Sequence, residues 1–251
     1  ITISIRGERL PASLPRGGAR IGGGAIVDPK LMQFIDAERF PAVFSTEELL
    51  SQGDLPVERR CYRKGDIIFQ AGERHPFTYH VGSGIVRLYL SSPEGTVKTL
   101  FYHAAGTQFA FQGFKRDRMT RSTAVAVTDC ELYAVDYADL IAFCDDHTEY
   151  YMAYIEYLFS IMNSQTEEIA SLSFQTGLRR VAQLLYALTC DGNPEVPYSI
   201  DEVAEIVGAH RNTVSNAFSH LRKLGLLEKA PRPVRVRDVE GLRLFVGAAD
   251  A

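Results

Sequence analysis

The chain changes from a β pattern to a helical pattern near residue 137, and this switch constrains the fold more than any other feature. From about 58 to 137, short β-rich segments alternate with glycine-containing turns, and no long helical pattern interrupts them. From about 137 to 173, apolar residues recur at helical spacing. The sequence therefore predicts an α+β fold in which an antiparallel β-roll (jelly-roll) precedes a long helix, and it disfavours a parallel βαβ sheet.

The predicted strands lie between turn signals such as those around Gly65, Gly72 and Gly95. Short segments rich in β-branched and aromatic residues between such turns are typical of a sandwich or barrel. We expect strands at residues 67–70, 85–90, 96–103, 123–127 and 131–135.

Composition and period divide the 251 residues into four parts. The N-terminal arm is rich in Gly, Pro and Arg and has weak periodicity, so we expect it to be flexible. The next part opens with short helical pieces, where Ser45 and Glu48 have capping-box spacing. The predicted parts are the arm at 1–30, the β-roll at 31–137, the long helix at 138–173 and a C-terminal domain at 174–251.

Two rows of residues spaced by seven run along the predicted long helix. The rows lie three or four residues apart, as the a and d positions of a coiled coil do. Gln165 interrupts one row, and a lone polar residue in such a seam fixes its register. The spacing favours a homodimer over a helix that packs only on its own domain. The predicted dimer seam consists of Tyr151, Ile155, Leu158, Met162, Gln165 and Ile169, continued by Leu172.

Residues 199–225 have the spacing of two short helices joined by a tight turn. Ser199 and Glu202 form a capping box before the first helix, and Gly208 ends it. The second helix starts around 209–211, with apolar residues on one side. Its other side carries Arg, Asn and hydroxyl groups without an acid, which suits reading of the major groove. This is the form of a helix-turn-helix whose second helix is the recognition helix.

The segment 210–237 holds seven Lys and Arg residues and one acid, although the whole chain has a net charge of −4. At 234–237, alternating Val and Arg after a proline-containing turn predict a hairpin wing with basic residues outward. Helices, wing and charge together favour DNA binding over an αα-hairpin in a small helical core. The predicted DNA contacts are Ser199, His210, Arg211, Asn212, Thr213, Ser215, Asn216, Ser219, Arg222 and Arg235.

These motifs resemble the Crp/Fnr superfamily of bacterial transcription regulators. The most specific match is EVAEIVGAHRNTVSNAFSHLRKLGLLE at 202–228, and FQTGLRRVAQLLYAL at 174–188 is similar to the start of the family's DNA-binding domain. The β part resembles the family more loosely, through YRKGDIIFQAGE and VGSGIVRLYL. The resemblance implies a homodimer that binds double-stranded DNA at an inverted repeat, with RNA polymerase as a further candidate partner. It also implies that a small molecule sensed in the roll reorients the DNA-binding domains.

Two departures from the family pattern bear on specificity. Asn212 and Asn216 stand where members often carry Glu and Arg, which implies a different operator half-site. Members that bind cyclic nucleotides pair Gly-Glu with a following Arg-Ser or Arg-Thr. Here FAFQG at 109–113 lacks the Glu, and Arg121 is one residue out of register. We therefore expect a small effector other than cyclic AMP.

Aromatic residues surround Gln112, which stands at the position of the missing acid. They suit a ring or an alkyl body held between the roll and the long helix, with a few polar groups that fix its orientation. The alternative is that they fill the core of the roll without a ligand. The candidate effector-binding residues are Phe109, Phe111, Gln112, Phe114, Arg121, Thr123, Tyr151, Tyr154 and Leu158.

Other cofactors and activities have weaker support. His80 and His103 leave a haem- or redox-sensing regulator of the same fold as an alternative. A cupin-like metal enzyme would need grouped metal ligands, and His75, His80 and His103 lack that layout, so we expect neither a metal site nor an enzyme. No C-x-x-C pair is present, so a zinc ribbon or iron–sulfur cluster is not expected. Candidate redox switches are Cys61, Cys130, Cys144 and Cys190.

The sequence gives no sign of a membrane or secreted protein. It has no run of 18 apolar residues and no basic-then-apolar segment after Ile1. Its 46% hydrophobic and 23% charged residues are ordinary globular values. We therefore expect a cytoplasmic protein without a membrane partner.

Overall fold

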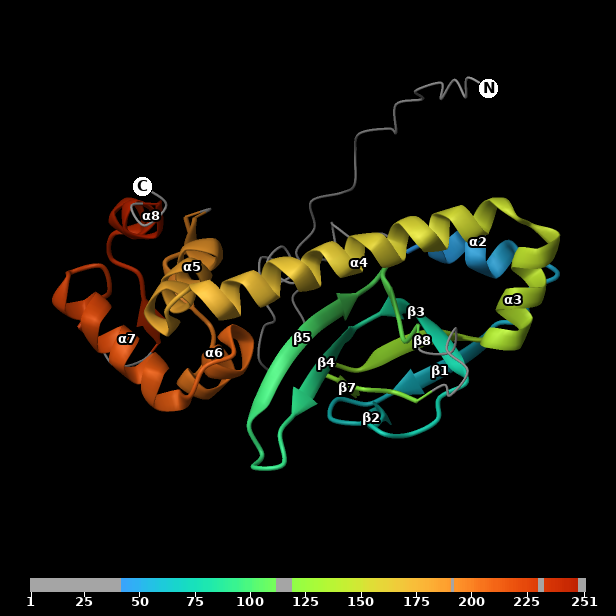
Figure 1. Ribbon diagram of the computed structural model, residues 1–251, viewed down its shortest axis with the longest axis horizontal. Coiled ribbons are helices and arrows are strands. Elements are labelled where there is room, and N and C mark those ends of the chain that lie inside the picture. The colour runs from blue at the N-terminus through green and yellow to red at the C-terminus, as the bar shows by residue number, and fades with distance from the viewer. Residues whose placement is uncertain (1–41, 112–118, 191, 230–232, 248–251) are drawn as a thin grey trace, which may run out of the picture.

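The computed structural model describes residues 42–111, 119–190, 192–229 and 233–247, so the predicted N-terminal arm lies outside the described part. Two antiparallel four-stranded sheets form the β-roll (Figure 1). One sheet has the order β1 (Glu58–Tyr62), β8 (Cys130–Asp136), β3 (Phe77–Ser83) and β6 (Gln108–Phe109). The other has the order β2 (Ile67–Phe69), β7 (Thr123–Ala126), β4 (Ile85–Ser91) and β5 (Val97–Ala104).

The core of the roll follows from the alternation of side chains along its strands. In β4, Val86 and Leu88 are buried, whereas Arg87 between them faces the other side of the sheet. Val81 of β3 and Leu132 of β8 join the same buried cluster. The ends of the five predicted strands are confirmed to within one residue. β3 was not predicted, because four successive residues are buried and the strand therefore does not alternate.

The prediction of one helix from 138 to 173 is wrong in one respect. The chain forms α3 (Tyr137–Asp146) and α4 (Glu149–Phe174), with a corner at His147. At this corner the backbone has φ −128 and ψ 69, and Nε2 of His147 lies 2.8 Å from Oδ2 of Asp54. The long helix thus begins at Glu149 and runs along the roll towards the C-terminal part (Figure 1).

The C-terminal part consists of helices around a buried core and a small sheet (Figure 1). Both predicted capping boxes are confirmed, Ser45 with Glu48 before α2 (Thr46–Ser51) and Ser199 with Glu202 before α6. The elements of this part are α5 (Gly177–Thr189), β9 (Glu195–Val196), α6 (Ile200–Val207), α7 (Arg211–Lys223), β10 (Val234–Arg235) and α8 (Val239–Gly247).

The predicted wing contains more than a hairpin. Val236 forms a β-bridge with Leu227, as a hairpin requires, and β10 also pairs with β9. Val234 and Val236 are buried, Arg237 is exposed and Arg235 is half-buried, so the alternation is as expected. β9 was not predicted, because its two residues lie between prolines and are too few to show a period.

Candidate DNA-binding and effector sites

The turn between α6 and α7 is fixed by its backbone conformation and by capping contacts. Gly208 ends α6 with φ 61 and ψ 49, a left-handed conformation that glycine adopts at low cost. His210 caps α7, because its Nδ1 accepts a hydrogen bond from the Asn212 N–H (3.3 Å). Arg180 of α5 donates to the carbonyl oxygens of Val207 (2.9 Å) and Gly208 (3.2 Å), which have no partner within α6. These contacts fix the turn and therefore the angle between α6 and α7.

The second helix, α7, has one buried face and one exposed face. Val214, Phe218 and Leu221 are buried in a core shared with α5 and α6. The opposite face carries hydrogen-bond donors and acceptors and no acid of its own. Its exposed residues are Arg211, Asn212, Thr213, Ser215, Asn216 and Ser219, together with His220 and Lys223, which were not predicted as contacts.

The three predicted arginine contacts already have partners in the protein. Arg211 forms an ion pair with Asp201 of α6, an acid that the pattern of α7 alone did not reveal. Arg235 lies 3.8 Å from an acid of β9. These two arginine side chains are 54% and 43% exposed and can exchange their partners for DNA. Arg222 is half-buried, and its Nε donates to the carbonyl of Glu228 (3.3 Å), so it holds the start of the wing instead.

A cavity of about 150 Å³ lies between the roll and α4. α4 contributes Leu158, Ile161 and Gln165, and the roll contributes the polar residues His103 and Ser122. No charged side chain is among the described lining residues. Three of the predicted effector residues, Phe109, Phe111 and Leu158, line this cavity. The remaining apolar walls are Leu88, Leu100, Phe101, Phe109, Ala110 and Phe111.

Four other predicted effector residues lie away from this cavity. Tyr154 is buried beside Phe44, with ring centroids 6.4 Å apart, and Tyr151 donates a hydrogen bond to an acid of α3. Both tyrosines therefore stabilise the corner between α3 and α4. Arg121 is exposed, and the hydroxyl of Thr123 accepts a hydrogen bond from the backbone next to β2. Outside the described residues lie Gln112 and Phe114.

His103, a candidate haem ligand in the sequence analysis, is one of the cavity residues. Its side chain is 5% exposed, lines the cavity and stacks on Phe109 with ring centroids 5.2 Å apart. Burial lowers the pKa of His103 to about 3, so its imidazole is neutral at pH 7. His80, the other candidate haem ligand, lies elsewhere, with Nε2 2.7 Å from Oγ1 of Thr46.

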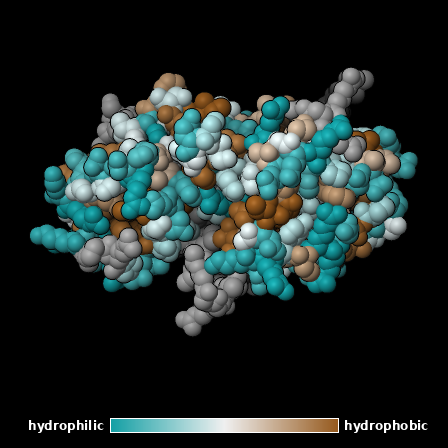
Figure 2. All heavy atoms as spheres, turned by 90° about the horizontal axis from the view of Figure 1, so that it is seen from below, coloured by the Kyte–Doolittle hydropathy of each residue, from teal (hydrophilic) through white to brown (hydrophobic). Residues whose placement is uncertain are grey.

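α4 also carries an exposed apolar row on a face about 100° round the helix from the cavity residues. Three members of the predicted seam, Ile155, Met162 and Ile169, belong to it. Leu158 and Gln165 do not, because they turn towards the roll. Monomeric proteins rarely expose a contiguous apolar row of this kind. Figure 2 shows another face of the molecule, which is mainly hydrophilic. The exposed row, 42–64% exposed, comprises Met152, Ile155, Phe159, Met162 and Ile169.

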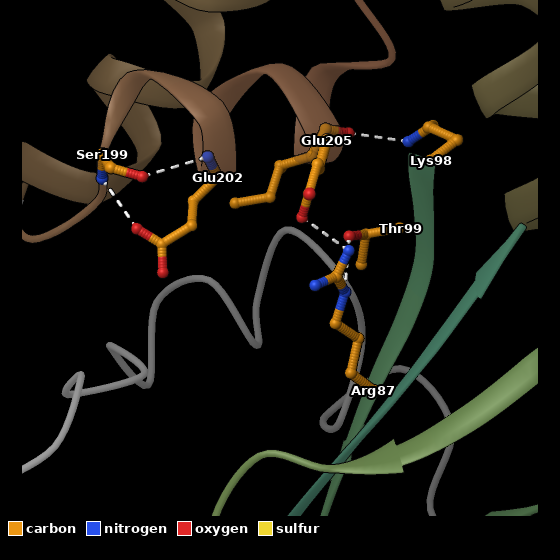
Figure 3. A network of polar contacts seen from close by, with 7 residues as sticks. Arg87, Lys98, Thr99, Ser199, Glu202 and Glu205 are labelled. Atoms are coloured by element: carbon orange, nitrogen blue, oxygen red, sulfur yellow. Dashed lines mark hydrogen bonds and ion pairs between the residues drawn. The ribbon is translucent and has the colours of Figure 1, made fainter. Parts of the chain in front are cut away.

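A polar junction joins the roll to the first helix of the helix-turn-helix (Figure 3). Arg87 of β4 donates to Glu205 of α6 (2.7 Å). Lys98 of β5 donates to the carbonyl of Ile206 (2.7 Å) and pairs with Glu168 of α4 (2.7 Å). The Arg87 and Lys98 side chains are only 18% and 20% exposed. The junction therefore connects the roll, the long helix and the DNA-binding part directly.

The described part of the chain also bears on metal, redox and membrane chemistry. It contains no group of three His, Cys, Asp or Glu side chains placed to hold a metal ion. None of its helices is both long enough and apolar enough to cross a bilayer. Cys130 and Cys144 are buried, and burial raises the pKa of both thiols, which disfavours the reactive thiolate. Cys61 and Cys190 are exposed free thiols.

Comparison with known proteins finds matches for both parts of the chain. Residues 59–147 match the family profile described as "Cyclic nucleotide-binding domain". Residues 179–245 match the profile described as "Crp-like helix-turn-helix domain".

Whole-chain relatives match as well. The cyclic AMP receptor protein of Thermus thermophilus is 30% identical over 182 residues, which are 72% of this chain and 84% of that protein. The transcriptional activator FnrA of Stutzerimonas stutzeri is 22% identical over 83% of this chain and 88% of its own. A crystal structure of a Crp/Fnr-family protein from Eubacterium rectale has a TM-score of 0.66 at 18% identity, covering 86% of this chain and 97% of that one. This last likeness is one of fold.

Proposed function

The chain belongs to the Crp/Fnr family of transcription regulators, and on that premise we propose that it binds an inverted-repeat operator as a homodimer. A small effector other than cyclic AMP controls it, through the cavity between the roll and α4. The regulator works in the bacterial cytoplasm and carries out no catalysis. RNA polymerase is a candidate partner at the promoter.

The exposed, acid-free face of α7 is the observation that carries this proposal. Arg211 and Asn216 are exposed on this face, and both suit contacts with base edges, since Arg pairs bidentately with guanine and Asn with adenine. Arg235 of the wing is placed to meet phosphate. Because Arg211 is paired with Asp201 in the free protein, DNA must replace an existing ion pair at this position.

The chemistry of the cavity supports an effector other than a cyclic nucleotide. A bound phosphate needs a matching positive charge, and an unpaired buried phosphate is costly. None of the described lining residues is charged. Arg121, the candidate partner for a phosphate, is exposed and does not line the cavity.

The exposed row on α4 supports the homodimer. Its five members are spaced by three, four, three and seven residues, which matches the a and d positions of a coiled coil. We therefore place Met152 and Phe159 in the seam, in place of Tyr151 and Leu158. An effector in the cavity touches the same helix and can change how two copies of α4 pair.

Selection of bound sequences from random DNA tests the function. The expected product is an inverted repeat whose half-sites lie about one helical turn, roughly 34 Å, apart. Arg211→Ala should cost about 1–3 kcal/mol at one base pair and relax the preference there. Arg235→Ala should weaken binding to all sequences and reduce the salt slope by about one.

Arg59→Ala is the matched control, because Arg59 is an exposed arginine of the roll. It should leave affinity and sequence preference unchanged. Enriched sites without two-fold symmetry would exclude the homodimeric arrangement, and no enrichment would exclude specific DNA recognition.

A further inference from the structure

Two buried polar side chains open onto the cavity without a protein partner. His103 is 5% exposed and Ser122 is 3% exposed, and both line the cavity. Neither side chain forms a hydrogen bond within the described part of the chain, and neither has a polar atom among the fully enclosed, unpartnered ones, so their polar atoms reach the cavity. Buried polar groups are nearly always paired, because an unpaired one costs free energy. These two side chains therefore mark a place where a bound molecule completes the hydrogen bonding.

The size of the cavity restricts what can bind. Its volume is about 150 Å³. A cavity of about this volume, lined by Leu, Ile and Phe, binds benzene in an engineered protein. Leu100, Phe101 and Ile161 supply similar walls here. One six-membered ring fits such a space.

The charge of the cavity restricts the ligand further. No described lining residue is charged, and the low pKa of His103 keeps its imidazole neutral. A carboxylate or phosphate would be buried without a counter-charge and would lose its hydration. The surroundings thus favour an uncharged molecule.

We propose that the effector is an uncharged, phenol-like molecule, with one aromatic ring and a hydroxyl group, and that His103 is its hydrogen-bonding partner. A hydroxyl group both donates and accepts, and a neutral imidazole does the same through its two nitrogens. Ser122 provides a second polar contact, and the ring of Phe109 stacks on His103 and orients its imidazole. The role as an effector rests on the proposed function, whereas the binding chemistry rests on the cavity alone.

Calorimetry with the full chain tests this assignment, using phenol, toluene, benzoate and cyclic AMP as probes. Phenol should bind more tightly than toluene, and benzoate and cyclic AMP should produce no heat of binding. His103→Leu should weaken phenol binding about 3- to 10-fold, the equivalent of one net hydrogen bond, and leave toluene binding unchanged. Binding of toluene to the variant also shows that the cavity is still folded.

His75→Leu is the matched control, since His75 is a second buried histidine that does not line the cavity. It should leave the ratio of phenol to toluene affinity unchanged. The assignment is overturned if both variants lose phenol equally, if benzoate or cyclic AMP binds at least as tightly as phenol, or if no neutral ring binds. Because the proposed effector controls DNA binding, the selection of DNA is run both without ligand and with phenol. Failure in both, beside selective phenol binding, would contradict the DNA-binding function and leave the cavity assignment standing.

Discussion

At the scale of single residues, Gly208 shows how closely the turn, α4 and β5 approach one another. Its φ of 61 lies in the left-handed region. A Cβ atom at this position would lie 2.9 Å from Cδ2 of Leu172 and 3.0 Å from Cδ of Lys98. The backbone of the turn, the end of α4 and β5 therefore meet at one point. A residue with a Cβ atom at position 208 would displace Leu172 or Lys98, so only glycine fits there.

Gly208→Ala should reduce the free energy of unfolding by about 1–3 kcal/mol, because it adds left-handed strain and displaces two packed side chains. Gly225→Ala is the control, since Gly225 has φ 78 but nothing within 4 Å of an added Cβ. Urea unfolding of both variants separates the two effects. Equal losses would mean that the contacts with Leu172 and Lys98 contribute nothing.

Single residues also show where sequence reasoning reaches its limit. The exposed face of α7 could be predicted, because it depends only on the period of one helix. The cavity could be predicted only in part, because its walls come from strands and a helix far apart in the sequence. His103 was considered as a haem ligand for this reason, since no local pattern shows that it faces Leu158 and Gln165 across a cavity.

At the scale of elements, α4 shows how one helical period can correspond to two faces. Its apolar residues cover two neighbouring faces, one towards the roll and one exposed. The sequence alone could not tell these faces apart, so the predicted seam took one row from each. The corner before α4 was missed because no local period marks it, and the contact that His147 makes there is with Asp54, which is remote in the sequence.

Phe159→Asp combined with Met162→Asp should convert dimers into monomers, because it places two charges in the exposed row. Specific DNA binding should be lost with the dimer. Leu244→Asp on α8 is the control, as Leu244 is equally exposed (57%) but lies outside α4. Sedimentation velocity measures the outcome, and an unchanged dimer in the double variant would show that copies pair through another surface.

The junction between β4 and α6 can be tested by a double-mutant cycle with Arg87→Gln and Glu205→Gln. The coupling free energy should be about 0.5–3 kcal/mol, because the pair is close and shielded from solvent. Thermal unfolding provides the measurement. A parallel cycle on Arg59 and Glu131, where Arg59 is 64% exposed, should give a smaller coupling. Coupling no larger than in that cycle would mean that the ion pair does not bind α6 to the roll.

At the scale of the whole molecule, the buried histidines predict a loss of stability in mild acid. Burial lowers the pKa of His75 and His80 to about 4 and that of His103 to about 3. The ordinary value is 6.5, so between these values the unfolded chain binds more protons than the folded one. The free energy of unfolding should therefore be highest above pH 6.5 and fall as the pH drops towards 4.

Urea unfolding at pH 7, 6 and 5 measures this dependence. His103→Leu should make it shallower by up to about 1.4 kcal/mol per pH unit, the contribution of one proton. Stability that stays constant from pH 7 to 5 would show that these histidines are accessible to protons in the folded state.

The placement of the cavity and the exposed row on one helix has a consequence for equilibrium measurements. In the proposed homodimer, self-association and uptake of the proposed effector form a closed thermodynamic cycle, in which each changes the other by the same factor. If a ligand in the cavity of one chain makes that chain associate tenfold more tightly, association must make the same chain hold its ligand tenfold more tightly. The apparent ligand affinity thus becomes a property of how much protein is present, and dilution alone would release the ligand.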